Sequence, residues 1–118
     1  MKLEHEIINK EVLKIKLCHN HLDASVTTDL KNELLAYVDE HKLYQVMLDL
    51  NEVEFIDSSG LGTLLAVMRE LVTKNGTLKL ASLTSPVRTM VELVRLHRIM
   101  EIYNTNEAAI RSFKLVKI

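Results

Sequence analysis

Hydrophobic and polar positions alternate along residues 2–18. The positions that share one side of this alternation are Leu3, His5, Ile7, Leu13, Ile15 and Leu17. A period of two predicts two strands with one exposed face each, and Asn9-Lys10-Glu11 between them predicts a hairpin turn. The lysines on the outer face disfavour edge-to-edge pairing with another chain.

The rest of the chain alternates between helical stripes and apolar runs. Residues 19–25 are polar and predict a loop, after which Thr27 or Thr28 is expected to cap a helix. Further helices are predicted over 59–74, from Ser85-Pro86 onward and near the C-terminus. Strands are predicted over 45–50, over 78–83 and around Ile102-Tyr103. The helical stripes are defined by Leu30, Leu34, Leu35, Val38, Leu61, Leu64, Leu65, Met68, Leu71, Val72, Val87, Met90, Val91, Val94, Ala109, Ile110 and Phe113.

The predicted order of elements is β-β-α-β-α-β-α-β-α. Helices between strands imply a parallel or mixed sheet, to which the opening hairpin adds an antiparallel edge. The run 46–50 is nearly all apolar, as in a central strand covered on both faces. Gly76 is expected to end the helix 59–74 in the left-handed conformation. No linker or repeat divides the sequence, so we expect one α/β domain over residues 1–118.

Composition and charge narrow the class of protein. The 118 residues are 47% hydrophobic and 26% charged, and the net charge of −1 gives no basic footprint for nucleic acid. No apolar run is long enough for a transmembrane helix, and the charged N-terminus lacks the apolar stretch of a signal peptide. The single cysteine, Cys18, excludes an internal disulfide and fits a reducing compartment. We therefore expect a cytoplasmic protein with no direct nucleic-acid binding and no membrane insertion.

The run FIDSSGLGTLL at residues 55–65 carries the strongest functional signal. It follows an apolar strand and leads into a helical stripe, so Asp57, Ser58, Ser59 and Gly60 are predicted at the start of a helix. That end has free N–H groups and the positive end of the helix dipole. A hydroxyl there, with no base nearby in sequence, is poorly suited to act as a nucleophile. It is well suited to carry a phosphate, which a helix N-terminus tolerates.

Other chemical sites find little support in the sequence. Gly60-Leu61-Gly62 is no dinucleotide fingerprint, because Leu65 stands where the third glycine belongs. A Walker lysine and a Gly-x-Ser-x-Gly nucleophile elbow are both lacking. His19 and His21 have no evident third ligand, which favours a solvated loop over a metal site. We therefore expect no catalytic residue, no metal and no cofactor.

Several segments together resemble the STAS domain, and most closely the stand-alone bacterial anti-sigma factor antagonists. The matching segments are Leu22-Asp23-Ala24, residues 46–50 followed by 53–62, Pro86-Val87-Arg88 through Leu93, Ile102-Tyr103 and Glu107-Ala108-Ala109. The resemblance spans residues 3–113. Two positions depart from it. His19-Asn20-His21 stands where relatives often have a pair such as Gly-Glu, and Arg95 or His97 replaces a glycine common after the third helix.

The resemblance implies a regulatory switch. In that family an anti-sigma factor, itself a serine kinase of the histidine-kinase ATPase type, phosphorylates the serine after the aspartate. Here that serine is Ser58, with Ser59 as the alternative. The unphosphorylated antagonist binds the anti-sigma factor and frees the sigma factor for transcription; the phosphorylated form is released, and a phosphatase resets it. By the same analogy, the partner-binding residues are Asp23, Asp57, Ser58, Ser59 and Gly60.

Each of these residues also has a purely structural interpretation. Ser58 or Ser59 would cap the helix, Asp57 would serve as a turn or cap residue, and Asp23 would cap the first helix. Gly60 and Gly62 would permit close approach of a partner or tight helix packing. For Gly62, backbone geometry is the favoured explanation.

Two other functions remain open at this stage. STAS domains also occur in anion transporters and lipid-transport complexes, so the chain could be a subunit or domain of a membrane transport system. Met1 directly before the first strand favours a free-standing protein. A small enzyme or nucleotide-binding protein of flavodoxin-like form is disfavoured because the motifs it would need are missing.

Overall fold

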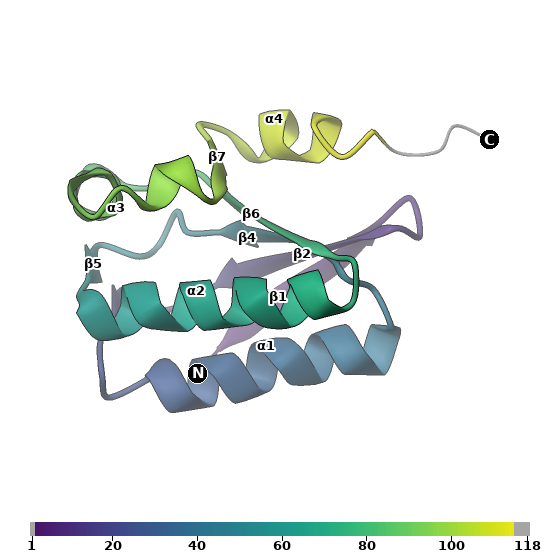
Figure 1. Cartoon of the computed structure of the whole chain (residues 1–118), viewed down its shortest axis with the longest axis horizontal. Coiled ribbons are helices and arrows are strands. Elements are labelled where there is room, and N and C mark those ends of the chain that lie inside the picture. Colours follow the sequence, from purple (N-terminus) through teal and green to yellow (C-terminus); the bar gives the residue numbers. More distant parts are fainter. Residues whose placement is uncertain (1, 115–118) are drawn as a thin grey trace.

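The computed structural model of the chain describes residues 2–114 and is built around a mixed sheet (Figure 1). The strands follow the order β1-β2-β4-β6-β7. They are β1 (Leu3–Ile8), β2 (Val12–Leu17), β4 (Gln45–Asp49), β6 (Thr77–Ala81) and β7 (Glu101–Tyr103). The β1–β2 pair is antiparallel, whereas β2–β4, β4–β6 and β6–β7 are parallel. This confirms the predicted α/β class, with the opening hairpin at one edge of the sheet.

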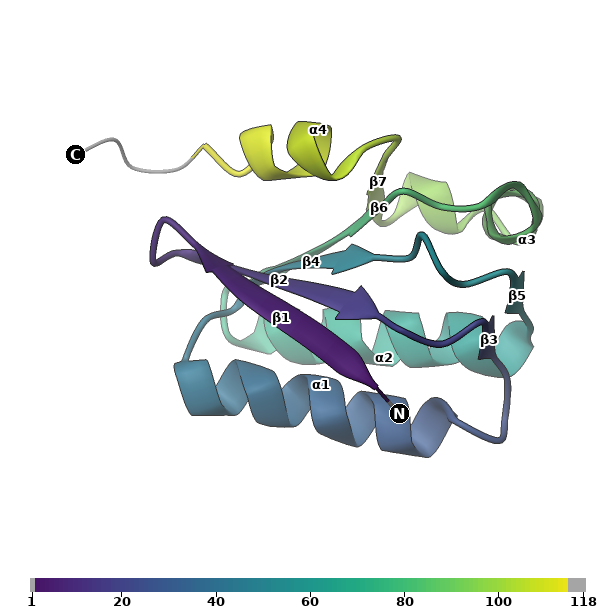
Figure 2. The ribbon, with the colours of Figure 1, turned by 180° about the vertical axis from the view of Figure 1, so that it is seen from behind.

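Helices lie on both sides of the sheet, as Figures 1 and 2 show from opposite directions. The helices are α1 (Thr27–His41), α2 (Ser58–Thr73), α3 (Ser85–Leu93) and α4 (Asn106–Arg111), and a short 3-10 helix, η1 (Leu96–Arg98), follows α3. Helices α1 and α2 lie side by side against one face, and α4 covers part of the opposite face. Helix α3 lies at the end of the sheet where the parallel strands finish, which is also where α2 begins.

The main core lies between the sheet and the pair α1–α2. Its most buried side chains include Leu13, Ile15, Leu17, Leu30, Leu34, Val38, Val46, Leu48, Leu64, Val67 and Leu71. Most of the predicted helical stripes therefore face the sheet as expected. Full burial of each such side chain stabilises the fold by about 1.5–3 kcal/mol. A smaller cluster of Met47, Ala81 and Ala109 joins the opposite face to α4.

Buried polar contacts hold α4 in place beside that smaller cluster. The Asp49 carboxylate accepts a 2.9 Å hydrogen bond from the Asn106 side-chain amide at the start of α4. Just after the helix, the Ser112 hydroxyl accepts a 2.7 Å hydrogen bond from the Lys79 ammonium. Because both Asp49 and Lys79 are buried, these partners offset their loss of hydration.

The predicted loop 19–25 contains a short strand that the sequence pattern did not indicate. Strand β3 (His21–Leu22) pairs in parallel with β5 (Phe55–Ile56) and forms a separate two-stranded sheet. Two residues are too few to show a period of two, so this part of the loop prediction is wrong for a simple reason. The pairing joins the segment before α1 to the segment before α2.

Two predicted features at helix ends are also wrong. Helix α1 begins at Thr27, and Val26 in the cap position makes no side-chain hydrogen bond, so neither Thr27 nor Thr28 is the cap. Asn75, with φ of 58°, adopts the left-handed conformation that was expected of Gly76. The Gly76 N–H instead donates to the Leu71 carbonyl at 2.7 Å.

The lack of a side chain at Gly76 has a steric cause. A Cβ built there would lie 2.2 Å from the Tyr44 carbonyl oxygen.

The apolar stripe of α3 also ends earlier than predicted. Helix α3 stops at Leu93, and Val94 is 53% exposed because it lies past the helix end.

Candidate functional site

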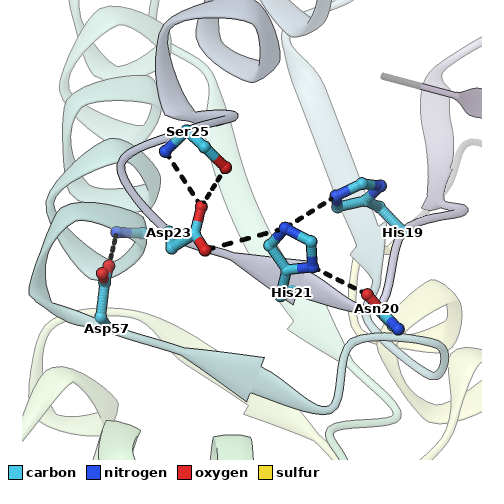
Figure 3. A network of polar contacts seen from close by, with 7 residues as sticks. His19, Asn20, His21, Asp23, Ser25 and Asp57 are labelled. Carbon is cyan, nitrogen blue, oxygen red and sulfur yellow. Dashed lines mark hydrogen bonds and ion pairs between the residues drawn. The ribbon is translucent and has the colours of Figure 1, made fainter.

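The start of α2 is anchored to the segment that precedes α1 (Figure 3). The Asp57 N–H donates a 3.2 Å hydrogen bond to the Leu22 carbonyl, and the Glu54 N–H donates a 2.8 Å hydrogen bond to the Asn20 carbonyl. In the β3–β5 ladder His21 pairs with Phe55 and Leu22 pairs with Ile56. These bonds place Asp23, the residue after Leu22, beside the first turn of α2. The structure thus brings the two predicted halves of the site together.

Asp57 is the N-cap of α2. Its backbone is extended, with φ of −110° and ψ of −173°, and its carboxylate accepts a 3.1 Å hydrogen bond from the Gly60 N–H. A cap of this kind stabilises a helix by about 1 kcal/mol. The expectation that Ser58 or Ser59 caps the helix is wrong because α2 begins at Ser58, one residue earlier than predicted. The structural interpretation of Asp57 as a cap residue is confirmed.

The two serines occupy different environments within the first turn. Ser58, the first helical residue, is exposed, whereas Ser59 is half-buried. The Ser59 carbonyl accepts a 3.0 Å hydrogen bond from the Thr63 hydroxyl, which ties this residue into the helix. Of the two hydroxyl-bearing residues, Ser58 is therefore the more accessible to another protein. Because Asp57 occupies the Gly60 amide, the amides of Ser58 and Ser59 are the remaining first-turn donors near an added phosphate.

The two glycines of this segment differ in their surroundings. A Cβ on Gly60 would lie 2.4 Å from the Leu22 carbonyl oxygen and 2.7 Å from Ile56 Cγ1. Gly60 is therefore required for close packing of α2 against β3 and β5. At Gly62, no described atom beyond its own stretch of helix lies within 4 Å of such a Cβ, and its φ is not positive. Backbone geometry, the favoured explanation for Gly62, is therefore wrong.

Asp23 organises the turn before α1. Its carboxylate accepts hydrogen bonds from the Ser25 hydroxyl and, at 2.9 Å, from the Ser25 N–H (Figure 3). The Ser25 hydroxyl lowers the pKa of Asp23 most strongly; partial burial opposes this effect, while the Ser25 amide and nearby His21 add to the lowering. Asp23 bonds to the turn and not to the first turn of α1, so its expected capping role is wrong. The signal that could have identified Ser25 is the Asp-x-Ser spacing of an Asx turn.

Replacing Ser25 with alanine is expected to raise the pKa of Asp23 toward its ordinary value, because the strongest donor to the charged carboxylate is removed. A folded-state pKa below the unfolded one gives stability that is present above the ordinary aspartate pKa of about 3.9 and is lost as the pH falls through the folded value. Carbon-detected NMR titration measures the pKa of Asp23 in the unaltered chain and in Ser25→Ala. Thr28→Ala, which removes an exposed hydroxyl at the start of α1, is the control. An identical Asp23 titration in Ser25→Ala would contradict the assignment.

His19 and His21 contact each other next to this turn. Their Nε2 atoms are 3.3 Å apart, and His21 Nδ1 lies 2.8 Å from the Asn20 side-chain oxygen (Figure 3). His21 Nε2 also lies 3.7 Å from the Asp23 carboxylate. Within residues 2–114, no group of three or more His, Cys, Asp or Glu side chains is arranged to hold a metal ion.

Cys18, directly after β2, is half-buried and does not have the environment of a reactive thiol. Burial and a 3.3 Å contact with the Glu4 carboxylate raise the pKa of the thiol. The thiol is therefore protonated at neutral pH, and a protonated thiol is a poor nucleophile. The exposed residue Ser58, at the start of α2, carries the accessible hydroxyl of this segment.

Comparison with known proteins gives one family. A family model described as STAS domain matches residues 8–109. The chain is 36% identical over 85 residues to BtrV of Bordetella bronchiseptica, which is named as an anti-sigma factor antagonist, and the match covers 72% of each chain. It is 24% identical over 116 residues to the anti-sigma F factor antagonist of Paenibacillus polymyxa, covering 98% of this chain and 96% of that protein.

The fold is shared with the solved antagonist SpoIIAA. The unphosphorylated form of SpoIIAA superposes with a TM-score of 0.77 at 23% identity, covering 98% of this chain and 100% of that one. The phosphorylated form from Bacillus gives a TM-score of 0.70 at 23% identity, covering 96% and 100%. Among the helices of residues 2–114, none combines the length and apolar character that a membrane span requires.

Proposed function

Because the chain belongs to the STAS-domain family, we propose that it is an anti-sigma factor antagonist controlled by phosphorylation of Ser58. In this proposal residues 1–118 form one cytoplasmic STAS domain without catalytic residues or a cofactor. The unmodified chain binds an anti-sigma factor that is also a serine kinase. The anti-sigma factor then releases its sigma factor, which becomes free for transcription. Phosphorylation releases the antagonist, and a phosphatase restores it.

The observation that carries the proposal is the exposure of Ser58 as the first residue of α2. It belongs to a turn that is held by the Asp57 cap and by the Asp57–Leu22 hydrogen bond. The histidines of the neighbouring loop bond to each other and to Asn20, so they do not supply a base to the hydroxyl. Such a hydroxyl is suited to receive a phosphoryl group in the active site of another protein. The existence of SpoIIAA in two phosphorylation states supports the same idea.

The energetics explain why the phosphate would act at an interface. A phosphoserine adds about −1.5 to −2 charges at neutral pH. At an exposed helix N-terminus an anion gains about 0.3–1 kcal/mol, which Asp57 and Asp23 partly offset by repulsion. The folded domain therefore tolerates the modification. A partner that covers Ser58 would instead have to desolvate an added dianion, at a cost of several kcal/mol.

The same geometry supports the proposed partner-binding residues. The Asp57 carboxylate caps the first turn of α2, the Asp57–Leu22 hydrogen bond holds the segment that leads into Asp23, and Gly60 lets α2 pack against β3. We propose that these residues, together with Ser59 as part of the covered surface, contact the anti-sigma factor. Ser58 is preferred to Ser59 as the phosphoacceptor because it is the more exposed of the two.

The test is phosphate transfer from ATP. Serine kinases of the histidine-kinase ATPase class encoded in the same genome would each be incubated with the chain and labelled ATP. We expect one of them to add a single phosphate that mass spectrometry maps to Ser58. Ser59→Ala should still be labelled and Ser58→Ala should not. Labelling that persists in Ser58→Ala would contradict the assignment, and stable co-purification with a membrane transporter in the absence of labelling would favour the transport alternative.

A further inference from the structure

Gly62 is an exposed glycine inside a helix, and nothing within the described chain explains it. An exposed helix-interior glycine is less stable than alanine because it loses more backbone freedom on folding. Gly60, two residues earlier, has a steric reason for lacking a side chain, because a Cβ there would lie 2.4 Å from a backbone oxygen. At Gly62 the corresponding space is open, and φ is not positive.

The position of Gly62 relates it to Ser58. Residues four apart on a helix lie one above the other, with Cβ positions about 5–6 Å apart. Both residues are exposed, whereas Gly60 and Leu64 on the other side of α2 are buried. Ser58 and Gly62 therefore belong to the same exposed strip of the helix. Any protein that encloses the Ser58 hydroxyl must also lie over the bare backbone at Gly62.

We propose that Gly62 is a contact residue for the anti-sigma factor kinase, and that its missing side chain lets this partner approach the α2 backbone beside Ser58. This inference rests on the proposed function, because that function identifies the occupant of the surface. Gly62 thus favours docking at the expense of helix stability. A side chain at this position should strengthen the helix and weaken the complex, two effects that a merely structural glycine would not combine.

Gly62→Ala and Gly62→Leu test this inference with the kinase that labels Ser58. The melting temperature of Gly62→Ala should rise by roughly 2–5 °C, because helix propensity improves and the added methyl meets open space. Its dissociation constant for the kinase, measured by calorimetry without ATP, should increase roughly tenfold, as expected when a methyl group is forced into a packed contact. Gly62→Leu should weaken binding roughly a hundredfold or more.

The controls separate this inference from the function on which it rests. Ala36→Leu adds the same kind of bulk to an exposed position on α1 and should leave the dissociation constant unchanged. If Ser58→Asp weakens binding while both Gly62 variants bind within twofold of the unaltered chain, the Gly62 contact is refuted and the switch stands. If no kinase binds or labels the chain, the proposed function itself fails. If the Gly62 variants weaken binding but Ser58→Asp does not, the contact stands and the phosphate switch fails.

Discussion

The variant Ser58→Asp is expected to bind the anti-sigma factor kinase about a hundredfold more weakly than the unaltered chain. A carboxylate at this position introduces a charge that the partner must bury, and an unpaired buried charge costs about 2–5 kcal/mol at an interface. Since about 1.4 kcal/mol corresponds to a factor of ten in affinity, this range brackets a hundredfold loss. Calorimetric titration of Ser58→Asp and of the unaltered chain into the same kinase measures the two dissociation constants.

The same variant should be nearly as stable as the unaltered chain. Ser58 is exposed, and an acidic residue in the first turn of a helix is favourable by about 0.3–1 kcal/mol before repulsion from Asp57 is counted. We expect the melting temperature to change by less than about 3 °C. Ser58→Ala serves as the matched control, since it removes the hydroxyl without adding charge and should retain most of the affinity. A large drop in melting temperature in Ser58→Asp would show that the substitution acts by damaging the fold.

Gly60→Ala is expected to destabilise the domain by about 1–3 kcal/mol. The new methyl would lie 2.4 Å from the Leu22 carbonyl oxygen, 2.7 Å from Ile56 Cγ1 and 2.9 Å from Leu22 Cβ. Overpacking of this kind typically costs 1–3 kcal/mol, and the backbone contact cannot be relieved by a change of rotamer. Because the Leu22 carbonyl also accepts the Asp57 N–H, a shift would loosen the β3–β5 pairing that positions Asp23.

Gly62→Ala is the matched control for this prediction, because it makes the same chemical change two residues further along the same helix. Its Cβ meets open space, so the gain in helix propensity of about 0.5–1 kcal/mol is unopposed. Urea unfolding of both variants should therefore give free energies of unfolding that change in opposite directions. Equal effects at the two positions would contradict the assignment of Gly60 to packing against β3.

Elements with many residues were predictable from the sequence. The alternation along β2 and the stripe of Leu30, Leu34 and Val38 each follow from burial against one sheet face, and the apolar run of β4 follows from burial on both faces. A buried position recurs once per turn of a helix and at every second residue of a strand, so the apolar residues of the sequence show the same period. The strand-to-helix position of Ser58 followed from the same two patterns on either side of it.

Features set by one or two tertiary contacts were not predictable. Strand β3 has two residues, and its pairing with β5 depends on a partner that is more than thirty positions away in sequence. The distinction between Gly60 and Gly62 depends on the approach of Leu22, which local sequence does not record. Likewise, Asp57 rather than a serine caps α2, and its N–H bonds to the Leu22 carbonyl, a tertiary contact that local sequence does not record.

The most direct measurement compares two preparations of the same chain, one unmodified and one phosphorylated at Ser58 by its kinase. Their dissociation constants for that kinase and their melting temperatures would be determined under identical conditions, and the phosphorylated sample would be measured again after phosphatase treatment. We expect phosphorylation to weaken binding by about a hundredfold or more, to leave the melting temperature nearly unchanged, and to be fully reversed by the phosphatase. Equal dissociation constants for the two preparations would contradict this expectation.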